Sequence, residues 1–215
     1  MTGEKNPHLL TRWRTRGPAP QEAPLSAILV HGRGQEADYM VDVAERIGMD
    51  DIHQLYPVAH EKSWYPHRFM EPPAVNEPSL SYALEAVAAA VGRFSRAGVG
   101  NRRIALIGFS QGACLLAEYL ARTAFTPGAA VLLTGGYIGP AEDRRARGRL
   151  DGTPILLSSS EKDEWVPPGR VRETSRLFED MGAAVSTRIH DTAEHTVGDE
   201  EIVMVRDLLR ELRGN

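Results

Sequence analysis

The stretch "IALIGFSQGACLLAEYL", residues 104–120, places a serine between two spaced glycines at the point where the hydrophobic pattern changes period. Residues 104–107 are apolar without alternation, which is typical of a strand buried on both faces. Large side chains then recur at helical spacing over 115–120. Ser110 is therefore predicted to lie on a sharp turn between a buried strand and a helix.

Short apolar segments and amphipathic segments alternate along the whole chain. The predicted strands cover 25–30, 52–58, 103–108, 129–134, 154–158 and 184–190, the predicted helices include 36–48 and 168–181, and long loops are expected at 59–78 and 135–153. This alternation favours a mostly parallel sheet covered by helices on both faces, an α/β fold. We expect one domain over 1–215, in which the N-terminal segment 1–24 could contribute one edge strand.

The bulk composition is that of a globular chain with a sizeable core. Hydrophobic residues make up 42% of the 215 residues, charged residues 25%, and the formal net charge is −4. The negative net charge argues against nucleic acid or an anionic membrane as the main partner. Since no apolar run could span a bilayer and the start lacks a secretory leader, we expect a cytoplasmic monomer or homodimer with no integral membrane association.

The context of Ser110 is that of a nucleophile elbow, Gly-x-Ser-x-Gly between a strand and a helix. A serine hydroxyl is a weak nucleophile at neutral pH and needs a base, an acid that orients the base, and donors for an oxyanion. In this architecture the acid and then a histidine follow the serine. Both His190 and His195 qualify. His195 is preferred because it lies in the loop "DTAEHTVG", from which its ring can turn back over the sheet, whereas His190 ends a strand.

The acid is expected in "PILLSSSEKDEWVPP", directly after a predicted strand. Asp163 is the preferred residue, and position alone leaves Glu161 as an alternative. Two backbone N–H groups are the predicted oxyanion donors: that of Gln111 at the start of the helix, and that of Arg33 in "HGRG" after the first strand. Sites in parallel sheets form at the carboxyl ends of the strands, where these residues are expected.

Six motifs occur in the order and spacing of one known family: "LVHGRGQEADYM", "YPVAHEKSWYPHRF", "IALIGFSQGACLLAEYLAR", "TGGYIGP", "LDGTPILLSSSEKDEWVPPGRVRET" and "HTVGDEEIVMVRDLL". On these motifs, which run through nearly the whole chain, the protein resembles the bacterial phospholipase/carboxylesterase family of the α/β-hydrolase superfamily, which includes the acyl-protein thioesterases. The resemblance implies an α/β-hydrolase fold without a lid domain. It also implies a serine hydrolase that acts on carboxylic esters or thioesters.

The family's nucleophile, acid, base and two oxyanion positions match, respectively, Ser110, Asp163, His195, Arg33 and Gln111. Three positions depart from the residues that are frequent in the family: Ser158, Trp165 and Glu194. The last stands where a glycine often precedes the histidine, which puts a carboxylate beside His195. These departures bear on the shape of the pocket and leave the catalytic set intact.

The predicted function is a serine carboxylesterase that hydrolyses short- to medium-chain acyl esters of small molecules through an acyl-enzyme intermediate. Short chains are expected because no lid domain is inserted between 129–134 and 154–158 to bury a long acyl group. Apolar loop residues are the candidates for the substrate pocket: Trp64, Tyr65, Phe69, Met70, Tyr137, Ile138 and Trp165.

Two alternatives remain open from the sequence. The same residues would serve an acyl-thioesterase or a lysophospholipase, and a hydrolase fold can also act as a small-molecule binding protein. Metal and nucleotide sites are not expected, because the histidines lack ligand spacing and no glycine-rich phosphate loop follows a strand. The sequence therefore predicts neither a metal nor another cofactor.

Overall fold

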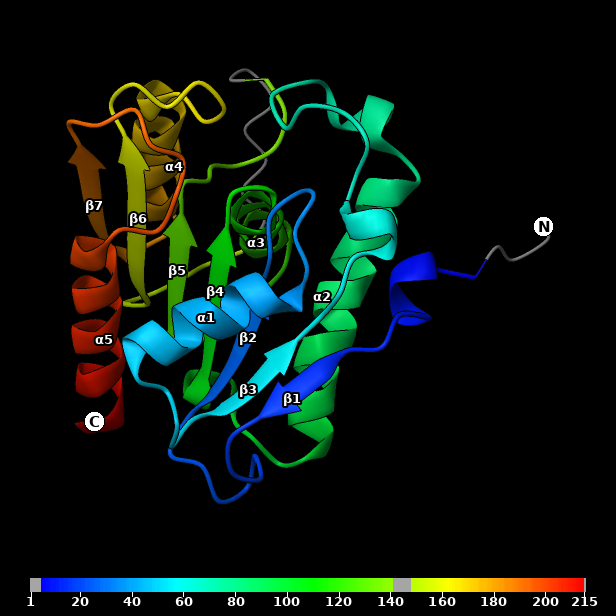
Figure 1. Cartoon of the computed structure of the whole chain (residues 1–215), viewed down its shortest axis with the longest axis vertical. Coiled ribbons are helices and arrows are strands. Elements are labelled where there is room, and N and C mark those ends of the chain that lie inside the picture. The colour runs from blue at the N-terminus through cyan, green and yellow to red at the C-terminus, as the bar shows by residue number, and fades with distance from the viewer. Residues whose placement is uncertain (1–4, 141–147, 215) are drawn as a thin grey trace.

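The computed structural model describes residues 5–140 and 148–214. Its strands form one sheet in the order β1-β3-β2-β4-β5-β6-β7 (Figure 1). The strands are β1 (Arg14–Arg16), β2 (Ser26–Val30), β3 (His53–Tyr56), β4 (Ile104–Phe109), β5 (Ala129–Leu133), β6 (Pro154–Ser160) and β7 (Ala184–His190). β1 is antiparallel to β3 at one edge, and every other pair is parallel.

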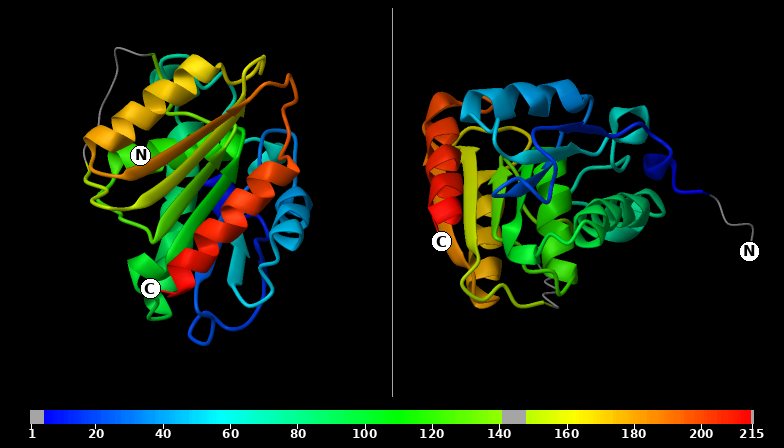
Figure 2. Two further views of the ribbon diagram at one scale, coloured as in Figure 1. Left: turned by 90° about the vertical axis from the view of Figure 1, so that its left-hand side faces the viewer. Right: turned by 90° about the horizontal axis from the view of Figure 1, so that it is seen from below.

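Helices cover both faces of this sheet. They are α1 (Ala37–Ile47), α2 (Ser79–Arg96), α3 (Gln111–Arg122), α4 (Pro168–Asp180) and α5 (Asp199–Gly214), with single 3-10 turns at Pro7–Leu9, His60–Lys62, Pro73–Asn76 and Asn101–Arg103. Helices α1 and α5 lie on one face, and α2, α3 and α4 lie on the other (Figures 1 and 2). The predicted mostly parallel sheet with helices on both faces is confirmed.

The central strands are buried along their whole length, as their continuous apolar runs predict. Successive side chains of each central strand point alternately into the two hydrophobic cores, one on each face of the sheet. In β4, Leu106 packs on the side of α2, α3 and α4, and Ile107 packs on the side of α1 and α5. The edge strand β7 is mostly exposed, which agrees with its mixed polar sequence. Burial on both faces therefore explains why the central strands β2, β4 and β5 contain so few polar residues.

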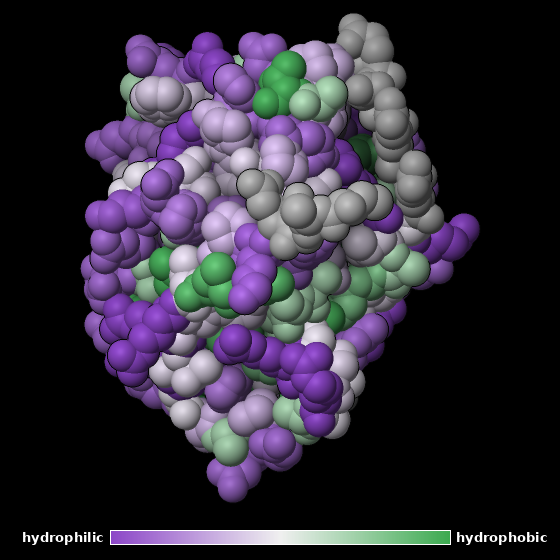
Figure 3. All heavy atoms as spheres, turned by 90° about the vertical axis from the view of Figure 1, so that its right-hand side faces the viewer, coloured by the Kyte–Doolittle hydropathy of each residue, from purple (hydrophilic) through white to green (hydrophobic). Residues whose placement is uncertain are grey.

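The surface that carries α2 and the N-terminal segment is mostly hydrophilic, with apolar residues in small scattered patches (Figure 3). Exposed large apolar side chains include Leu9, Leu10 and Val75. Scattered exposed apolar residues are usual on globular proteins. None of the helices within residues 5–140 and 148–214 combines the length and the apolar character that crossing a bilayer requires.

Because the strands are parallel, the loops that follow β2, β4, β6 and β7 all lie at the carboxyl ends of the strands. The predicted loop 59–78 also lies at this end of the sheet, and it contains two of the 3-10 turns. Of the predicted loop 135–153, residues 141–147 lie outside the described part of the chain. The candidate site is assembled from these converging loops.

Candidate active site

Ser110 lies on the turn between β4 and α3 with φ 52° and ψ −119°, in the left-handed region that non-glycine residues rarely adopt. Such a conformation costs about 1–3 kcal/mol and persists only where the surroundings impose it. Here the Ser110 N–H donates to the Leu133 carbonyl at 2.9 Å, and the Ser110 carbonyl accepts from the Cys114 N–H at 2.9 Å. These bonds fix the turn to β5 and to the first turn of α3.

The two glycines around the serine are required by close backbone approach. A Cβ atom on Gly112 would lie 2.2 Å from the Val30 carbonyl oxygen, and one on Gly108 would lie 2.7 Å from the Ala113 nitrogen. Any side chain at these positions would therefore force the backbone apart. The absence of side chains lets the start of α3 pack directly against the end of β2, beside the loop that contains Arg33.

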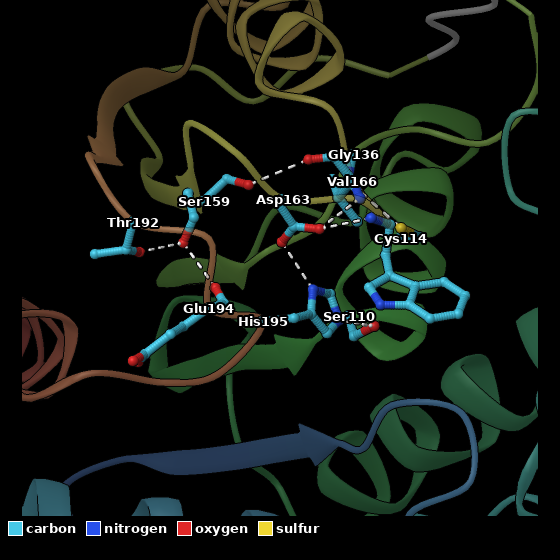
Figure 4. Close-up of polar contacts among 11 residues, drawn as sticks. Ser110, Cys114, Gly136, Ser159, Asp163, Val166, Thr192, Glu194 and His195 are labelled. Atoms are coloured by element: carbon cyan, nitrogen blue, oxygen red, sulfur yellow. Dashed lines mark hydrogen bonds and ion pairs between the residues drawn. The ribbon is translucent and has the colours of Figure 1, made fainter.

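A continuous chain of hydrogen bonds starts at the serine (Figure 4). Ser110 Oγ donates to His195 Nε2 at 2.8 Å, and His195 Nδ1–H donates to Asp163 Oδ2 at 2.7 Å. The Asp163 side chain is fully buried. Its second oxygen, Oδ1, accepts from the backbone N–H groups of Trp165 at 2.8 Å and Val166 at 2.9 Å. The carboxylate is thereby held in place, and the histidine tautomer leaves Nε2 free to accept a proton from the serine.

The two alternatives that the sequence left open lie elsewhere. His190, at the end of β7, has its Nε2 2.9 Å from Glu201 Oε1 on α5. Glu161 pairs with Arg172 on α4 at 3.1 Å. The chain of hydrogen bonds that begins at Ser110 therefore contains His195 and Asp163. It does not contain His190 or Glu161.

The predicted oxyanion donors lie on the same pocket as the serine hydroxyl. Arg33 follows β2, and Gln111 is the first residue of α3, where the positive end of the helix dipole lies. Neither backbone N–H donates a hydrogen bond to another residue within 5–140 or 148–214. Both groups are therefore available to a bound oxygen atom.

The side chains of these same two residues hold the neighbouring loop. The Arg33 guanidinium donates to the carbonyls of Pro66 at 2.5 Å, His67 at 2.7 Å and Tyr65 at 2.9 Å. Gln111 Nε2 donates to the Tyr65 carbonyl at 2.8 Å, and Gln111 Oε1 accepts from the Trp64 backbone N–H at 2.9 Å. The positions of the two N–H donors and of this pocket wall are thus linked through shared residues.

Two buried histidines support the loop from behind. His31 Nε2 accepts from the Ala59 N–H at 3.1 Å, and His8 Nδ1 accepts from the His60 N–H at 3.0 Å. His8 Nε2–H donates to the carbonyl of Trp64, whose own indole N–H donates to the His31 carbonyl. Burial lowers the pKa of His8 to about 4 and also lowers the pKa of His31. Both rings act as neutral structural acceptors.

A pocket of about 780 Å³ opens over Ser110 and His195. Three of the predicted substrate-binding residues line it: Tyr65, Phe69 and Trp165. The Trp165 side chain stands at the rim, with the residue 62% exposed. Sequence reasoning missed further wall residues: Arg68, Val75, Phe109 and Val166. Only Phe109 carried a usable signal, because it directly precedes the serine.

The other four predicted pocket residues do not line this pocket, and the expectation is corrected. Trp64 is fully buried behind the loop, and Met70 packs against the core. Tyr137 and Ile138 border a separate cavity of about 350 Å³, on the side of α3 and α4. The physical reason is that the loop after β5 turns toward those helices: the Tyr137 N–H donates to Thr174 Oγ1 on α4 at 3.1 Å.

The departures from the family pattern leave the bonded set unchanged. The Glu194 side chain is exposed and points away from His195 (Figure 4). Ser158 is fully buried within β6. In the described part of the chain, no group of three or more His, Cys, Asp or Glu side chains is arranged to hold a metal ion.

Comparisons with known proteins agree with this fold. A family model described as Phospholipase/Carboxylesterase matches residues 18–212. A crystal structure of a phospholipase/carboxylesterase from Dyadobacter fermentans is 34% identical, covers 92% of this chain and 96% of its own, and superposes with a TM-score of 0.88. No curated protein matches the sequence significantly.

More distant structures show the same fold. A carboxylesterase from Mesorhizobium loti is 24% identical, with a TM-score of 0.72 over 92% of this chain and 93% of its own. The Bacillus cereus carboxylesterase is 17% identical, with a TM-score of 0.75 over 94% of each chain. The predicted α/β-hydrolase fold is confirmed, and the chain belongs to the phospholipase/carboxylesterase family of hydrolases.

Proposed function

We propose that the protein is a serine carboxylesterase in which Ser110 is the nucleophile, His195 the general base and acid, and Asp163 the orienting acid. The observation that carries this proposal is the unbroken hydrogen-bond chain from a strained, pocket-lining serine through a histidine to a buried carboxylate. Membership of the family supports ester hydrolysis as the reaction.

The reaction follows from the positions of these atoms. Ser110 Oγ attacks the acyl carbon while His195 Nε2 takes the hydroxyl proton, and Asp163 stabilises the imidazolium that forms. The oxygen of the tetrahedral intermediate accepts from the N–H groups of Arg33 and Gln111. His195 then gives its proton to the departing alcohol, which leaves an acyl-Ser110 ester. Water attacks that ester with its proton passing to His195, and release of the carboxylic acid restores the serine.

We propose short- to medium-chain acyl esters as the substrates of this pocket. Its walls are largely apolar, with Tyr65, Phe69, Val75, Phe109 and Trp165 around the serine. An apolar acyl group is favoured there because its burial removes apolar surface from water. A series of p-nitrophenyl esters from acetate to palmitate should give the highest kcat/KM at short or medium length. Matching thioesters test the alternative, and a thioester preference above about tenfold would replace the ester assignment.

The direct test of the function is Ser110→Ala. Hydrolysis of p-nitrophenyl esters should fall by about four orders of magnitude or more, because the three groups act as a unit. Alanine keeps the Cβ atom and therefore the same backbone requirement at this turn, so circular dichroism and the melting temperature should stay close to those of the wild type. Full activity in the variant would contradict the assignment.

A further inference from the structure

Strand β6 ends in three consecutive buried serines, Ser158, Ser159 and Ser160, whose hydroxyls have no part in the proposed reaction. Buried hydroxyls are costly unless they are hydrogen-bonded, so their partners indicate what they do. Ser158 Oγ has no hydrogen-bond partner among the described residues. The other two hydroxyls each reach a loop that carries one member of the proposed catalytic set.

Ser160 contacts the loop that carries His195. Its Oγ donates to the carbonyl of Glu194 at 2.8 Å and accepts from Thr192 Oγ1 at 3.0 Å. Figure 4 shows Thr192 and Glu194 on the same loop as His195. Glu194 directly precedes the histidine, so this bond fixes the main chain one residue before the proposed base.

Ser159 contacts the other loop. Its Oγ donates to the Val166 carbonyl at 3.3 Å, and the Val166 N–H in turn donates to Asp163. Strand alternation explains this division, because neighbouring residues point to opposite faces. Leu156, and with it Ser158 and Ser160, points to the face of α1 and α5, toward which the histidine loop leads.

The histidine needs such support because it lies on a loop and not on a helix or strand. After His195 in the chain, the Val197 carbonyl accepts a hydrogen bond from the Arg46 guanidinium at 2.8 Å. Before it, the Glu194 carbonyl accepts the hydrogen bond from Ser160. Catalytic groups depend on accurate placement, and an error of about 1 Å can cost about a hundredfold in rate.

We propose that Ser160 is a positioning residue for His195. Its hydroxyl, itself oriented by Thr192, holds the Glu194 carbonyl and so keeps the imidazole within hydrogen-bonding distance of Ser110. This inference rests on the proposed function, since it assigns to Ser160 a role in the same reaction.

The test compares Ser160→Ala with Ser158→Ala, which removes an equally buried but unpartnered hydroxyl from the same face of the same strand. Ser160→Ala should lower kcat about tenfold with KM within about twofold, and should slow fluorophosphonate labelling of Ser110 by a similar factor. Ser158→Ala should leave both rates within about twofold of the wild type. A purely structural role for Ser160 would lower the melting temperature without this selective loss of kcat.

Thr192→Val completes a double-mutant cycle. If Thr192 acts through Ser160, the single variant should lose less than Ser160→Ala, and the double variant should be no slower than Ser160→Ala alone. Losses that multiply in the double variant would contradict the arrangement.

Wild type and Ser110→Ala measured beside these variants separate the possible failures. If Ser110→Ala is inactive and Ser160→Ala behaves like Ser158→Ala, the inference about Ser160 is overturned while the proposed function stands. If Ser110→Ala retains hydrolysis, the proposed function falls, and the role of Ser160 falls with it.

Discussion

On one side of the pocket, several donors share one carbonyl of the loop over 59–67, whereas on the other side the carbonyl that directly precedes His195 has one hydrogen-bond donor among the described residues. The Tyr65 carbonyl alone accepts from the side chains of Arg33, Gln111 and Ser63. The Glu194 carbonyl, beside the histidine, accepts from the single hydroxyl of Ser160.

This difference teaches how substitutions should divide between the two sides. Where several donors share one acceptor, the loss of one leaves the others in place, so the pocket wall should tolerate single changes with modest effects on KM. Where one bond holds the main chain beside a reacting group, its loss should appear in kcat. The following changes test that division, beginning with the largest expected effect.

Asp163→Asn should lower kcat by about 10⁴-fold. Because the backbone N–H groups of Trp165 and Val166 would hold the amide oxygen, the NH₂ group would face His195 Nδ1. The histidine would then carry its proton on Nε2 and could not accept one from the serine. Steady-state kinetics measure the loss, and Glu161→Gln is the matched control, since that carboxylate pairs with Arg172. Equal losses in the two variants would contradict the assigned roles.

Arg33→Met should have a smaller effect. The backbone N–H that is proposed to bind the oxyanion remains, whereas the guanidinium bonds to the carbonyls of Tyr65, Pro66 and His67 are lost. We expect KM to rise about threefold and kcat to stay within about twofold, because Gln111 still holds Tyr65.

Arg33→Lys, which keeps the charge but not the planar fork, should behave like Arg33→Met. A loss of kcat larger than that of Ser160→Ala would reverse the comparison between the two sides.

His8→Asn should change turnover least and the pH dependence of stability most clearly. The pKa of His8 is lowered to about 4 in the folded chain, from an ordinary value of 6.5. Between these values the unfolded chain binds more protons, so the free energy of unfolding should fall as pH falls from about 6.5 to about 4. This contribution is about 1–2 kcal/mol after allowance for solvent screening.

Asparagine cannot titrate, and its side-chain oxygen can accept from the His60 N–H in place of Nδ1. Urea unfolding at neutral pH and near pH 5 should therefore show a shallower loss of stability in His8→Asn than in the wild type. Part of the slope should remain, because burial also lowers the pKa of His31. An unchanged slope would show that His8 does not support the loop as a neutral acceptor.

The fold was predictable from the sequence because burial on two faces leaves a strong signal. β4 could be recognised from its apolar residues, and the turn at Ser110 from the glycines that close backbone approach requires. The preference for His195 over His190 followed from the difference between a loop and a strand end. In each case a local physical requirement restricted the residue types.

The pocket walls were less predictable, because loop side chains have no periodicity that shows which way they point. Tyr137 and Ile138 resembled pocket residues in type but lie toward α3 and α4, while Val75 had no distinguishing neighbour. The role of Ser160 depends on a contact with a loop far along the chain, which no local pattern encodes. Its one available signal was a run of hydroxyls in an otherwise apolar strand.

The site of covalent modification by a fluorophosphonate probe tests the central claim most directly. Mass spectrometry of the digested protein should find one adduct per chain, on the peptide that contains Ser110, and Asp163→Asn should form it far more slowly. A folded wild-type protein that takes up no probe, or that carries the adduct on another residue, would contradict the account.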